Sequence, residues 1–581
     1  MSHSYARFGG ALGLMLLLAS CQPAAESQGA PQASFAISFA DDISSVPLDG
    51  RLILLLSKND DDEPRFQVRP GVEAVQMFGL TVDGMAPGTE VIIDNNAFGY
   101  PYDSLAELPP GEYFVQVLLH KYDTFNLNNG KTIKLPMDHG EGQQWEKSPG
   151  NIYSEPRMLQ VGGAGQPISL LMDQVVEAVV APEDTEFVKH IRIRSDLLSE
   201  FWGRDMYLGA HVLLPAGFDE HPEARYPLAV WHGHFPADFE GFQTQPPDEN
   251  IECQRNESAN VDCYNRVVQQ EAYDFYQKWV GAEFPRMLIV QIQHANPYFD
   301  DSYAVNSANL GPYGDAITYE LIPHIEEQFR GLGEGWARFL YGGSTGGWEA
   351  FGVQVLYPDE FNGTFAGCPD SLDFRHYSAV NIYDDENAYR MKGDFNTVER
   401  PAYRDYLGNI TVTMEDENHM ELVVGDKSRS GGQWDIWEAV YSPMGEDGYP
   451  MRIWDKKTGE INHDVAAYWK ENYDMRHILE RDWATLGPKL EGKLNVFVGD
   501  MDNFHLNNAV YLLEDFLEST TDPYYAGFID YGDRQEHCWI GDQDNPIYIA
   551  GLRYNTMYVQ KILERIDATA PEGADLTSWR Y

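Results

Sequence analysis

Phe339-Leu340-Tyr341-Gly342-Gly343-Ser344-Thr345-Gly346-Gly347-Trp348 sets one serine among glycines, after an apolar run and before a helix-like segment. The run Ala337 to Tyr341 predicts a buried parallel strand, and Trp348 to Leu356 predicts a helix. The chain has to turn sharply between them, so its neighbours come too close for side chains, which gives Gly342, Gly346 and Gly347 a steric reason to be glycine. The stretch therefore predicts a strand, a tight turn and a helix in an α/β sheet.

The turn lifts the Ser344 hydroxyl out of the sheet, beside the first N–H groups of the following helix. These groups and the helix dipole favour negative charge that develops there. The pattern G-x-S-x-G in this context indicates a nucleophile elbow with Ser344 as the nucleophile. The alternative is a structural turn of glycine and serine without chemistry.

A serine nucleophile needs an acid and a histidine, which follow it in that order along such a chain. Leu494 to Val498 predicts a buried strand, and the loop Gly499 to Asn503 after it carries Asp500 and Asp502. We favour Asp502, because it lies farther out in the loop and can turn back toward the serine. The alternative for either residue is a solvated carboxylate, which is common in so acidic a chain.

His537 is the histidine candidate. Of the 16 histidines, it is the one that follows an apparent last strand, Tyr525 to Tyr531, and precedes a predicted C-terminal helix over residues 547 to 566. A lone histidine is more often structural, but its order and context here indicate a general base.

The elbow, together with Asn309-Leu310-Gly311-Pro312-Tyr313-Gly314-Asp315-Ala316-Ile317 and Glu320-Leu321-Ile322-Pro323, resembles the esterase D-like family of α/β-hydrolases. That family includes enterochelin, feruloyl and acetylxylan esterases, S-formylglutathione hydrolases and mycolyltransferases. The resemblance covers roughly residues 205 to 565, with insertions. It implies an α/β-hydrolase domain with Ser344 as nucleophile, His537 as base and Asp502 as acid, the last through a G-x-x-D loop that begins at Gly499. No metal or organic cofactor is implied.

An oxyanion hole should combine the N–H of Thr345 with an N–H from the loop after an early strand. The stretch Tyr226 to Phe235 fits that strand and loop, and Gly233 allows close backbone approach, so the N–H of His234 is the second expected donor. In the alternative, His232 and His234 bind a metal, because residues two apart on a strand point the same way. No further ligands with a recognisable spacing accompany them, so we expect no metal.

The N-terminus predicts the compartment. Residues 1 to 20 contain an apolar stretch and no acidic residue, which predicts a secretory signal too short to span a bilayer. Its end, Leu18-Ala19-Ser20-Cys21, resembles the lipobox of a bacterial lipoprotein, and this resemblance implies lipidation of Cys21, a membrane anchor and, because Gln22 follows, outer-membrane sorting. Residues 21 to 33 then form a flexible tether. The alternative is an ordinary cleaved signal with a chance cysteine.

Four cysteines remain beyond Cys21, and an exported protein can bridge them. Cys253 and Cys263 close a polar loop and are the favoured pair. Cys368 and Cys538 either bridge at the carboxyl edge of the sheet, where they would stiffen the histidine loop, or stay as two buried free thiols.

The 41 basic and 91 acidic residues give a formal charge of −50, which makes nucleic acid an improbable partner. A field of this sign suits uncharged substrates or salt-rich surroundings, and the sequence does not choose between them.

The 581 residues are enough for more than one domain. Short β-type runs over residues 34 to 180 predict a small β-sandwich, whose role is packing or spacing or, alternatively, substrate binding. The hydrolase domain follows over residues 186 to 581, and residues 371 to 485 are an aromatic-rich insertion that we expect to form a cap. Within it only Val465 to Leu479 has a clear helical pattern. Its aromatics either line a substrate platform or form the insertion's own core. For the platform, Trp434 and Trp437 are the candidates, because the double glycine before them can present them at a surface.

Together these patterns predict a lipid-anchored envelope protein with a serine esterase domain acting on a small-molecule or carbohydrate ester. The alternatives are an acyltransferase with the same three residues, or a binding lipoprotein with an inactive hydrolase fold.

Overall fold

The computed structural model describes residues 33–71, 74–162, 166–239, 241–255, 261–543 and 551–581. The predicted signal, Cys21 and nearly all of the predicted tether lie outside the described residues. Among the described residues, no helix combines the length and the apolarity that crossing a bilayer requires.

An eight-stranded sheet forms the centre of the molecule, in the order β13-β14-β16-β15-β19-β20-β25-β26. Only β14 runs antiparallel to its neighbours. The strands are β13 (Val188–Ser195), β14 (Met206–Leu213), β15 (Leu228–His232), β16 (Leu288–Gln293), β19 (Arg338–Gly343), β20 (Thr364–Gly367), β25 (Leu494–Gly499) and β26 (Phe528–Gly532). Numbered within the sheet this order is 1-2-4-3-5-6-7-8, so the fold is α/β-hydrolase-like, which confirms the predicted class.

Three inner strands, β15, β20 and β25, are buried along their whole length, which explains their continuous apolar sequences. Helix α5 (Thr345–Leu356) packs against β19 and β20 and has only its last residue outside the core. The other helices near the sheet are α1 (Asp196–Trp202), α2 (Tyr264–Trp279), α3 (Tyr313–Ala316), the π-helical η2 (Ile317–Leu321), α4 (Ile322–Gln328), α9 (Met475–Leu490), α10 (Asn507–Ser519), α11 (Tyr554–Met557) and α12 (Val559–Thr569). Short helical turns are η1 (Pro64–Phe66), η3 (Gly335–Ala337), η4 (Phe374–His376) and η5 (Gly551–Arg553).

The predicted C-terminal helix over residues 547 to 566 is partly wrong. Residues 547 to 550 lie outside the described part, and the chain then passes through η5 and α11 before α12 begins at Val559.

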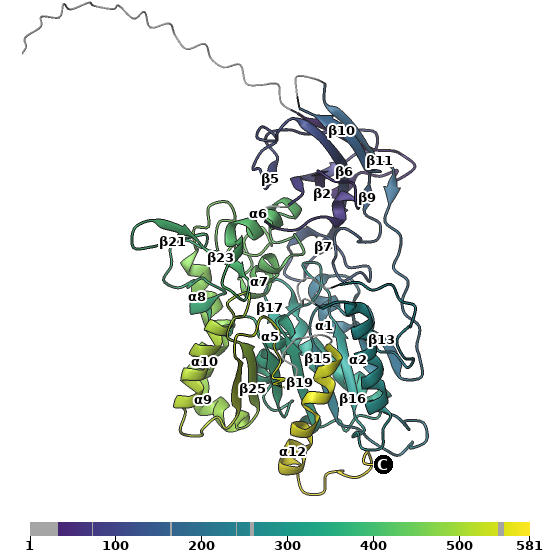
Figure 1. Cartoon of the computed structure of the whole chain (residues 1–581), viewed down its shortest axis with the longest axis vertical. Coiled ribbons are helices and arrows are strands. Elements are labelled where there is room, and N and C mark those ends of the chain that lie inside the picture. Colours follow the sequence, from purple (N-terminus) through teal and green to yellow (C-terminus); the bar gives the residue numbers. More distant parts are fainter. Residues whose placement is uncertain (1–32, 72–73, 163–165, 240, 256–260, 544–550) are drawn as a thin grey trace, which may run out of the picture.

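The N-terminal region is built from strands, at the upper end of the molecule in Figure 1. A three-stranded and a seven-stranded sheet pack around a shared apolar core. Its strands are β1 (Phe35–Phe39), β2 (Leu48–Ser57), β3 (Gln76–Met85), β4 (Val91–Ile93), β5 (Phe98–Tyr100), β6 (Gly111–Lys121), β7 (Asp123–Asn126), β8 (Thr132–Leu135), β9 (Ile152–Tyr153), β10 (Arg157–Val161), β11 (Ile168–Met172) and β12 (Gln174–Val175).

This region is joined to the rest of the chain on two sides. The second face of the seven-stranded sheet packs Ile53 and Leu55 against Val423 and Val424 of α6 (Met414–Val424). The hairpin of β7 and β8 contributes its apolar side chains to the main core. The predicted boundary at residue 180 is therefore crossed by apolar packing.

The segment between β20 and β25 contains more helix than the sequence pattern predicts. Besides α6 it forms α7 (Gln433–Tyr441), α8 (His463–Asn472) and α9, and the expectation of a single clear helix over Val465 to Leu479 is wrong. That stretch is divided at Tyr473 and Asp474, where the Asp474 carboxylate accepts the His477 N–H and caps α9. The small strands here are β21 (Arg390–Lys392), β22 (Thr397–Glu399), β23 (Pro401–Arg404) and β24 (Ile410–Thr413), and a further pair, β17 (Asn306–Ser307) and β18 (Gly311–Pro312), lies after β16.

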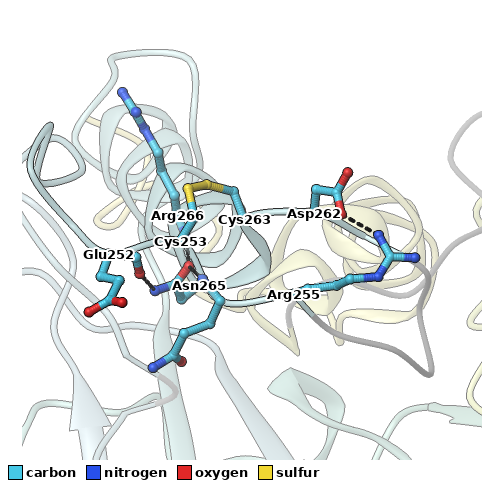
Figure 2. The surroundings of a disulfide bond; sticks show 8 residues. Glu252, Cys253, Arg255, Asp262, Cys263, Asn265 and Arg266 are labelled. Atoms are coloured by element: carbon cyan, nitrogen blue, oxygen red, sulfur yellow. Dashed lines mark hydrogen bonds and ion pairs between the residues drawn. A yellow bond between two sulfur atoms is a disulfide. The ribbon is translucent and has the colours of Figure 1, made fainter.

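The four described cysteines form one disulfide bond. Cys253 and Cys263 form the predicted disulfide, close to the N-terminus of α2 (Figure 2). Cys368 and Cys538 were expected either to form a bridge or to remain free, and in the structure both are free thiols.

Candidate active site

Ser344 lies in the turn between β19 and α5 and holds φ 57° and ψ −123°, a conformation that few non-glycine residues adopt. The glycines around it are required by contact. A Cβ on Gly346 would lie 2.1 Å from the His232 carbonyl oxygen, and one on Gly347 would lie 2.3 Å from that of Gly367. The tight turn expected from the sequence is present.

Three side chains from separate loops form a chain of hydrogen bonds beside this turn. His537 Nε2 lies 2.9 Å from Ser344 Oγ, and His537 Nδ1 lies 2.7 Å from Asp502 Oδ2. His537 follows β26, Asp502 follows β25 and Ser344 follows β19, so all three stand at the carboxyl edge of the sheet. The structure thus brings together the three residues that the sequence singles out.

The choice between the two acids is resolved geometrically. Asp502 is fully buried, and its Oδ1 accepts the N–H groups of Phe504 at 2.9 Å and Leu506 at 3.2 Å, which aims Oδ2 at the histidine. Asp500 instead accepts the Arg534 N–H at 2.6 Å on the exposed side of the loop. Asp502 is therefore the carboxylate that accepts the hydrogen bond from His537 Nδ1.

His537 is held in place and electrostatically biased. Its backbone N–H donates to Asn503 Oδ1 at 2.9 Å, and the Phe504 ring packs edge-on against the imidazole. Burial lowers the pKa of His537, but the neighbouring Cys538 and Asp502 raise it by more, so its pKa lies well above the usual value. These two neighbours therefore stabilise the positive charge that the ring would carry after accepting a proton.

A cavity of about 280 Å³ opens in front of Ser344. Its lining includes Gly343, His234, Phe235, Cys538 and Tyr554. Both expected oxyanion donors are near: Thr345 begins α5, and His234 lines the cavity. None of the hydrogen bonds among the described residues engages the N–H of Thr345 or that of His234.

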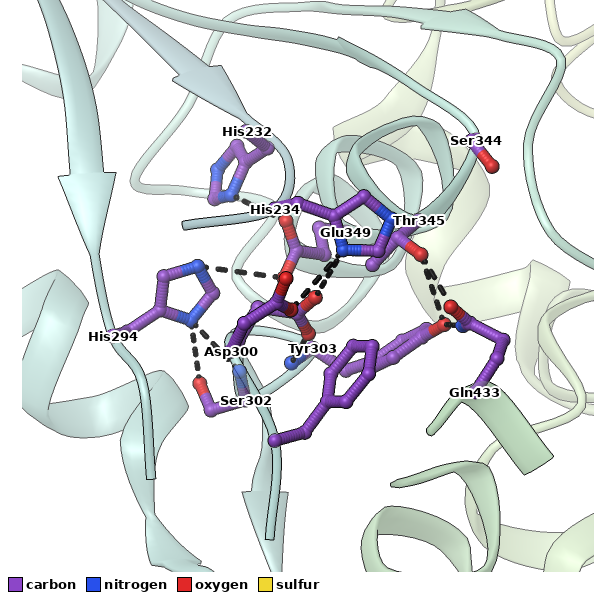
Figure 3. A network of polar contacts seen from close by, with 12 residues as sticks. His232, His234, His294, Asp300, Ser302, Tyr303, Ser344, Thr345, Glu349 and Gln433 are labelled. Carbon is purple, nitrogen blue, oxygen red and sulfur yellow. Dashed lines mark hydrogen bonds and ion pairs between the residues drawn. The ribbon is translucent and has the colours of Figure 1, made fainter. Parts of the chain in front are cut away.

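The His234 side chain has partners that the sequence did not suggest (Figure 3). Its Nδ1 lies 3.1 Å from Asp300 Oδ1 and 3.3 Å from Asp301 Oδ2. The two carboxylates raise the pKa of His234 well above the usual value, although half of its side chain is exposed. Burial also raises the pKa of Asp301 to about 7. A signal was available in principle, since Asp300 and Asp301 follow β16 at the same sheet edge.

His232 has different neighbours from His234. It is buried, its Nδ1 lies 3.5 Å from Glu349 Oε2 on α5, and His294 Nε2 lies 3.5 Å from Glu349 Oε1 (Figure 3). Burial lowers the pKa of His232 to about 3, so this imidazole is neutral. The alternative in which His232 and His234 share one metal is not supported, because their rings engage separate carboxylates. Within the described residues, His234 with Asp300 and Asp301 is one of two groups with three potential ligand atoms within 4.8 Å, the other being His537 with Cys368 and Cys538.

A third set of contacts supports the first turn of α5. Thr345 Oγ1 lies 3.1 Å from the Tyr303 hydroxyl and 3.2 Å from Asp370 Oδ2, and Gln433 also bonds Tyr303. Burial raises the pKa of Asp370. Asp370 follows β20 at the carboxyl edge of the sheet, which is the one sequence feature that could have marked it.

The expectation that Trp434 and Trp437 are presented at a surface is wrong. They are 5% and 7% exposed and belong to the main core, packed against each other and against Tyr377. Trp434 Nε1 donates to Glu417, and Trp437 Nε1 lies 3.2 Å from Asp370 Oδ2. Helix α7 is buried all round, so the double glycine turns the chain into the core rather than outward.

Comparison with known proteins gives distant structural likeness. No protein-family model matches the chain, and no curated protein matches it. Similar solved structures include a ferulic acid esterase (17% identity, 64% of this chain and 97% of that one, TM-score 0.32) and an S-formylglutathione hydrolase from Agrobacterium tumefaciens (12%, 66% and 97%, TM-score 0.31). Another is FphF, a fluorophosphonate-binding serine hydrolase of Staphylococcus aureus (13%, 65% and 98%, TM-score 0.30). Likeness this distant assigns neither residue roles nor a substrate to this chain.

Proposed function

We propose that the chain is a serine esterase that hydrolyses a carboxylic ester with Ser344, His537 and Asp502. The observation that carries the proposal is the continuous pair of hydrogen bonds from Asp502 Oδ2 through the His537 ring to Ser344 Oγ, in front of an open cavity. A nucleophile, a base and an orienting acid in this geometry are the requirements for acyl transfer through a covalent intermediate.

In the proposed reaction, Ser344 Oγ attacks the ester carbonyl carbon while His537 Nε2 takes its proton. Asp502 keeps the proton on Nδ1 and stabilises the imidazolium that forms. His537 then donates the proton to the leaving alcohol, and a water molecule repeats the sequence on the acyl-enzyme. The N–H groups of Thr345 and His234 are the proposed oxyanion donors, supported by their position beside the cavity.

The contacts of the His234 ring help to fix the position of the His234 N–H, the proposed second oxyanion donor. Because Asp300 and Asp301 hold Nδ1, the loop that carries the proposed second donor is tied to the segment after β16. Preorganised donors stabilise a developing charge without reorganising during the reaction.

The substrate class, the compartment and the division into domains are also proposals. We propose a carbohydrate or aryl ester as substrate, because such an ester is uncharged and is not repelled by a protein this acidic. We propose that residues 1 to 20 are a signal peptide, that Cys21 carries lipid in the outer membrane, that residues 34 to 180 are a β-sandwich domain, and that residues 371 to 485 cap the hydrolase domain.

The test measures hydrolysis of aryl, acetyl and feruloyl esters by the wild type and by Ser344→Ala. We expect the variant to lose a factor on the order of 10⁴ or more in kcat, because Ser344 Oγ is the atom that His537 Nε2 contacts. Ser519→Ala, at the exposed end of α10, is the matched control and should retain full activity.

Labelling with a fluorophosphonate separates an enzyme from a binding protein with an inactive fold, since only an activated serine reacts. A Ser344→Ala variant that keeps more than about a tenth of the wild-type rate would exclude the serine mechanism. Products in which an added sugar replaces water would identify the acyltransferase alternative.

A further inference from the structure

Two thiols that the proposed reaction does not use lie against its residues. Cys538 directly follows His537, and Cys368 directly follows β20, 170 residues away in sequence. Their Sγ atoms are 2.7 Å apart. A disulfide bond needs about 2.05 Å, so a small approach of the two sulfurs suffices for bonding.

Both thiols lie next to the backbone of the proposed catalytic residues. The Ser344 N–H lies 3.2 Å from Cys368 Sγ, in addition to its bond to the Gly367 carbonyl at 3.0 Å. Both cysteines hold left-handed backbone conformations, with φ 36° at Cys368 and 61° at Cys538. A bond between the sulfurs would therefore link the turn of Ser344 to the loop of His537.

The two thiols differ in access and in acidity. Cys538 is partly exposed and lines the same cavity as Ser344, whereas Cys368 is buried. A hydrogen bond from Cys368 and the nearby His537 lower the pKa of Cys538 to about 6, while burial raises the pKa of Cys368. A small molecule in the cavity thus meets one accessible thiolate with a second thiol directly behind it, the arrangement of an attacking and a resolving cysteine.

We propose that Cys538 and Cys368 are a redox-reactive pair, which a small disulfide compound entering the cavity of Ser344 oxidises to a bridge that ties the His537 loop to the nucleophile turn. Cys538 Sγ attacks one sulfur of the compound and expels the first thiolate, which takes up a proton. Cys368 then gives up its proton, attacks Cys538 Sγ and expels the second thiolate, which is also protonated. Two protein thiols are oxidised to one disulfide, and one disulfide compound is reduced to two thiols.

The bridge has a consequence for His537 that rests on the proposed function. The groups near this ring are Asp502 after β25, Asp370 after β20, and the thiols Cys538 and Cys368, one ring nitrogen lying within 4.8 Å of both sulfurs. Oxidation removes the negative charge of the Cys538 thiolate and leaves both carboxylates in place. The pKa of His537 should then fall, so the free base is available at lower pH, and the acid limb of kcat/KM should move down.

The experiment equilibrates the full-length protein in buffers of reduced and oxidised glutathione, followed by acid quenching and non-reducing peptide mapping. We expect a Cys368–Cys538 linked peptide in oxidising buffer and free thiols in reducing buffer. In parallel, the acid limb of kcat/KM for an aryl ester should lie about half a pH unit or more lower in the oxidised form. In Cys538→Ser the acid limb should not respond to the glutathione ratio, whereas in Cys368→Ser a glutathione adduct should remain on Cys538 and no linked peptide should form. The Cys253–Cys263 bridge serves as the internal control for oxidation.

The absence of the linked peptide where Cys253 and Cys263 are oxidised would overturn the proposal, and so would a glutathione adduct on Cys538 that Cys368 does not resolve. An unchanged acid limb in a fully bridged sample would remove the link to His537. The peptide is read whether or not esters are hydrolysed, so failure of the pair and failure of the esterase proposal are distinguishable.

Discussion

Ser344 shows how a strained residue is held by its neighbours. Its N–H donates to the Gly367 carbonyl, and its own carbonyl accepts the N–H groups of Gly347, Trp348 and Asp370 at 2.9, 3.1 and 3.2 Å. These bonds fix the left-handed backbone from both sides, so its cost of roughly 1–3 kcal/mol is offset within the turn. The hydroxyl can therefore stay 2.9 Å from His537 Nε2 without relying on its own side-chain packing.

The two acids of the Gly499 loop give the sharpest residue-scale prediction. Asp502→Asn should lower kcat by a factor on the order of 10³ or more, because an amide cannot keep the proton on His537 Nδ1 as the carboxylate does. Asp500→Asn should stay within about threefold of wild type, since its partner is the exposed Arg534 N–H. Steady-state kinetics on one aryl ester decide, with melting temperatures measured to detect unfolding. The reverse ranking would assign the acid role to Asp500, and two small effects would mean that another group orients the histidine.

At the scale of elements, buried strands were the most predictable part of the chain. The predicted Ala337 to Tyr341 became Arg338–Gly343, and Leu494 to Val498 became Leu494–Gly499, because parallel strands covered on both faces require unbroken apolar runs. Helix α6 escaped prediction because three acidic residues fill its first turn and its buried positions include Asn418 and Glu421. Helix α7 escaped because a helix buried all round has no polar face to mark its period.

The candidate site likewise has features that the sequence predicts and features that it does not. The order of Ser344, Asp502 and His537 along the chain was readable, because each follows a strand and strand ends converge at one sheet edge. Their catalytic roles stay a prediction. The contacts of His234 with Asp300 and of Thr345 with Tyr303 were not readable, because they depend on how irregular loops fold back over the sheet.

Burial of α7 changes what is expected of its two tryptophans. Trp434→Ala and Trp437→Ala should each lower stability by about 3–5 kcal/mol, since each leaves a large cavity. The first also removes the indole donor to Glu417, whereas Asp370 keeps the hydroxyls of Tyr303 and Thr345 when Trp437 is lost. Losses of kcat/KM should be parallel for a small acetyl ester and for a bulky aryl-sugar ester, because neither indole is exposed for contact with a remote group. Tyr383→Ala, a half-buried aromatic of the same insertion, is a comparison with a smaller expected loss of stability. A selective penalty on the bulky ester at unchanged melting temperature would restore the platform interpretation.

On the scale of the whole molecule, one feature of the packing joins distant parts of the sequence. Arg51 of β2 is buried and donates to the carbonyls of Val423 at 2.9 Å and Leu422 at 2.8 Å at the end of α6, which places a positive charge at the helix C-terminus. Helix α6 in turn caps α7, because Glu421 accepts the N–H groups of Trp434 and Asp435, both at 2.9 Å. The N-terminal strands are thus connected through two helices to the region behind Ser344.

Buried ionisable groups predict how the whole fold responds to pH. Burial raises the pKa of Glu141 and Asp301 to about 7 and that of Glu421 to about 8, so the folded state keeps protons that the unfolded state has released. Their stabilising contribution is complete below the unfolded carboxyl pKa and is lost as the pH rises through 7 to 8. Buried His120 and His232 act oppositely: with pKa values of about 3, they penalise the folded state at any pH below the unfolded value near 6.5.

Between the unfolded carboxyl value and pH 6.5 the loss from the three carboxylates exceeds the gain from the two histidines, and above pH 6.5 only the loss remains. We therefore expect the free energy of unfolding to fall by several kcal/mol from pH 5 to pH 8.5, most steeply between pH 6.5 and 7, a magnitude set by roughly 1.4 kcal/mol per unit of pKa shift. The formal charge of −50 adds self-repulsion over the same range, and 0.5 M NaCl should screen it and raise the melting temperature more at pH 8.5 than at pH 6. Urea unfolding at pH 5, 6, 7 and 8.5 measures the first effect, and thermal unfolding at the same pH values, with and without the salt, measures the second. A free energy of unfolding that rises steadily through pH 8.5 would mean that these carboxylates ionise in the folded state without cost. An equal response to salt at every pH would assign the salt effect to the fixed charge of the chain alone.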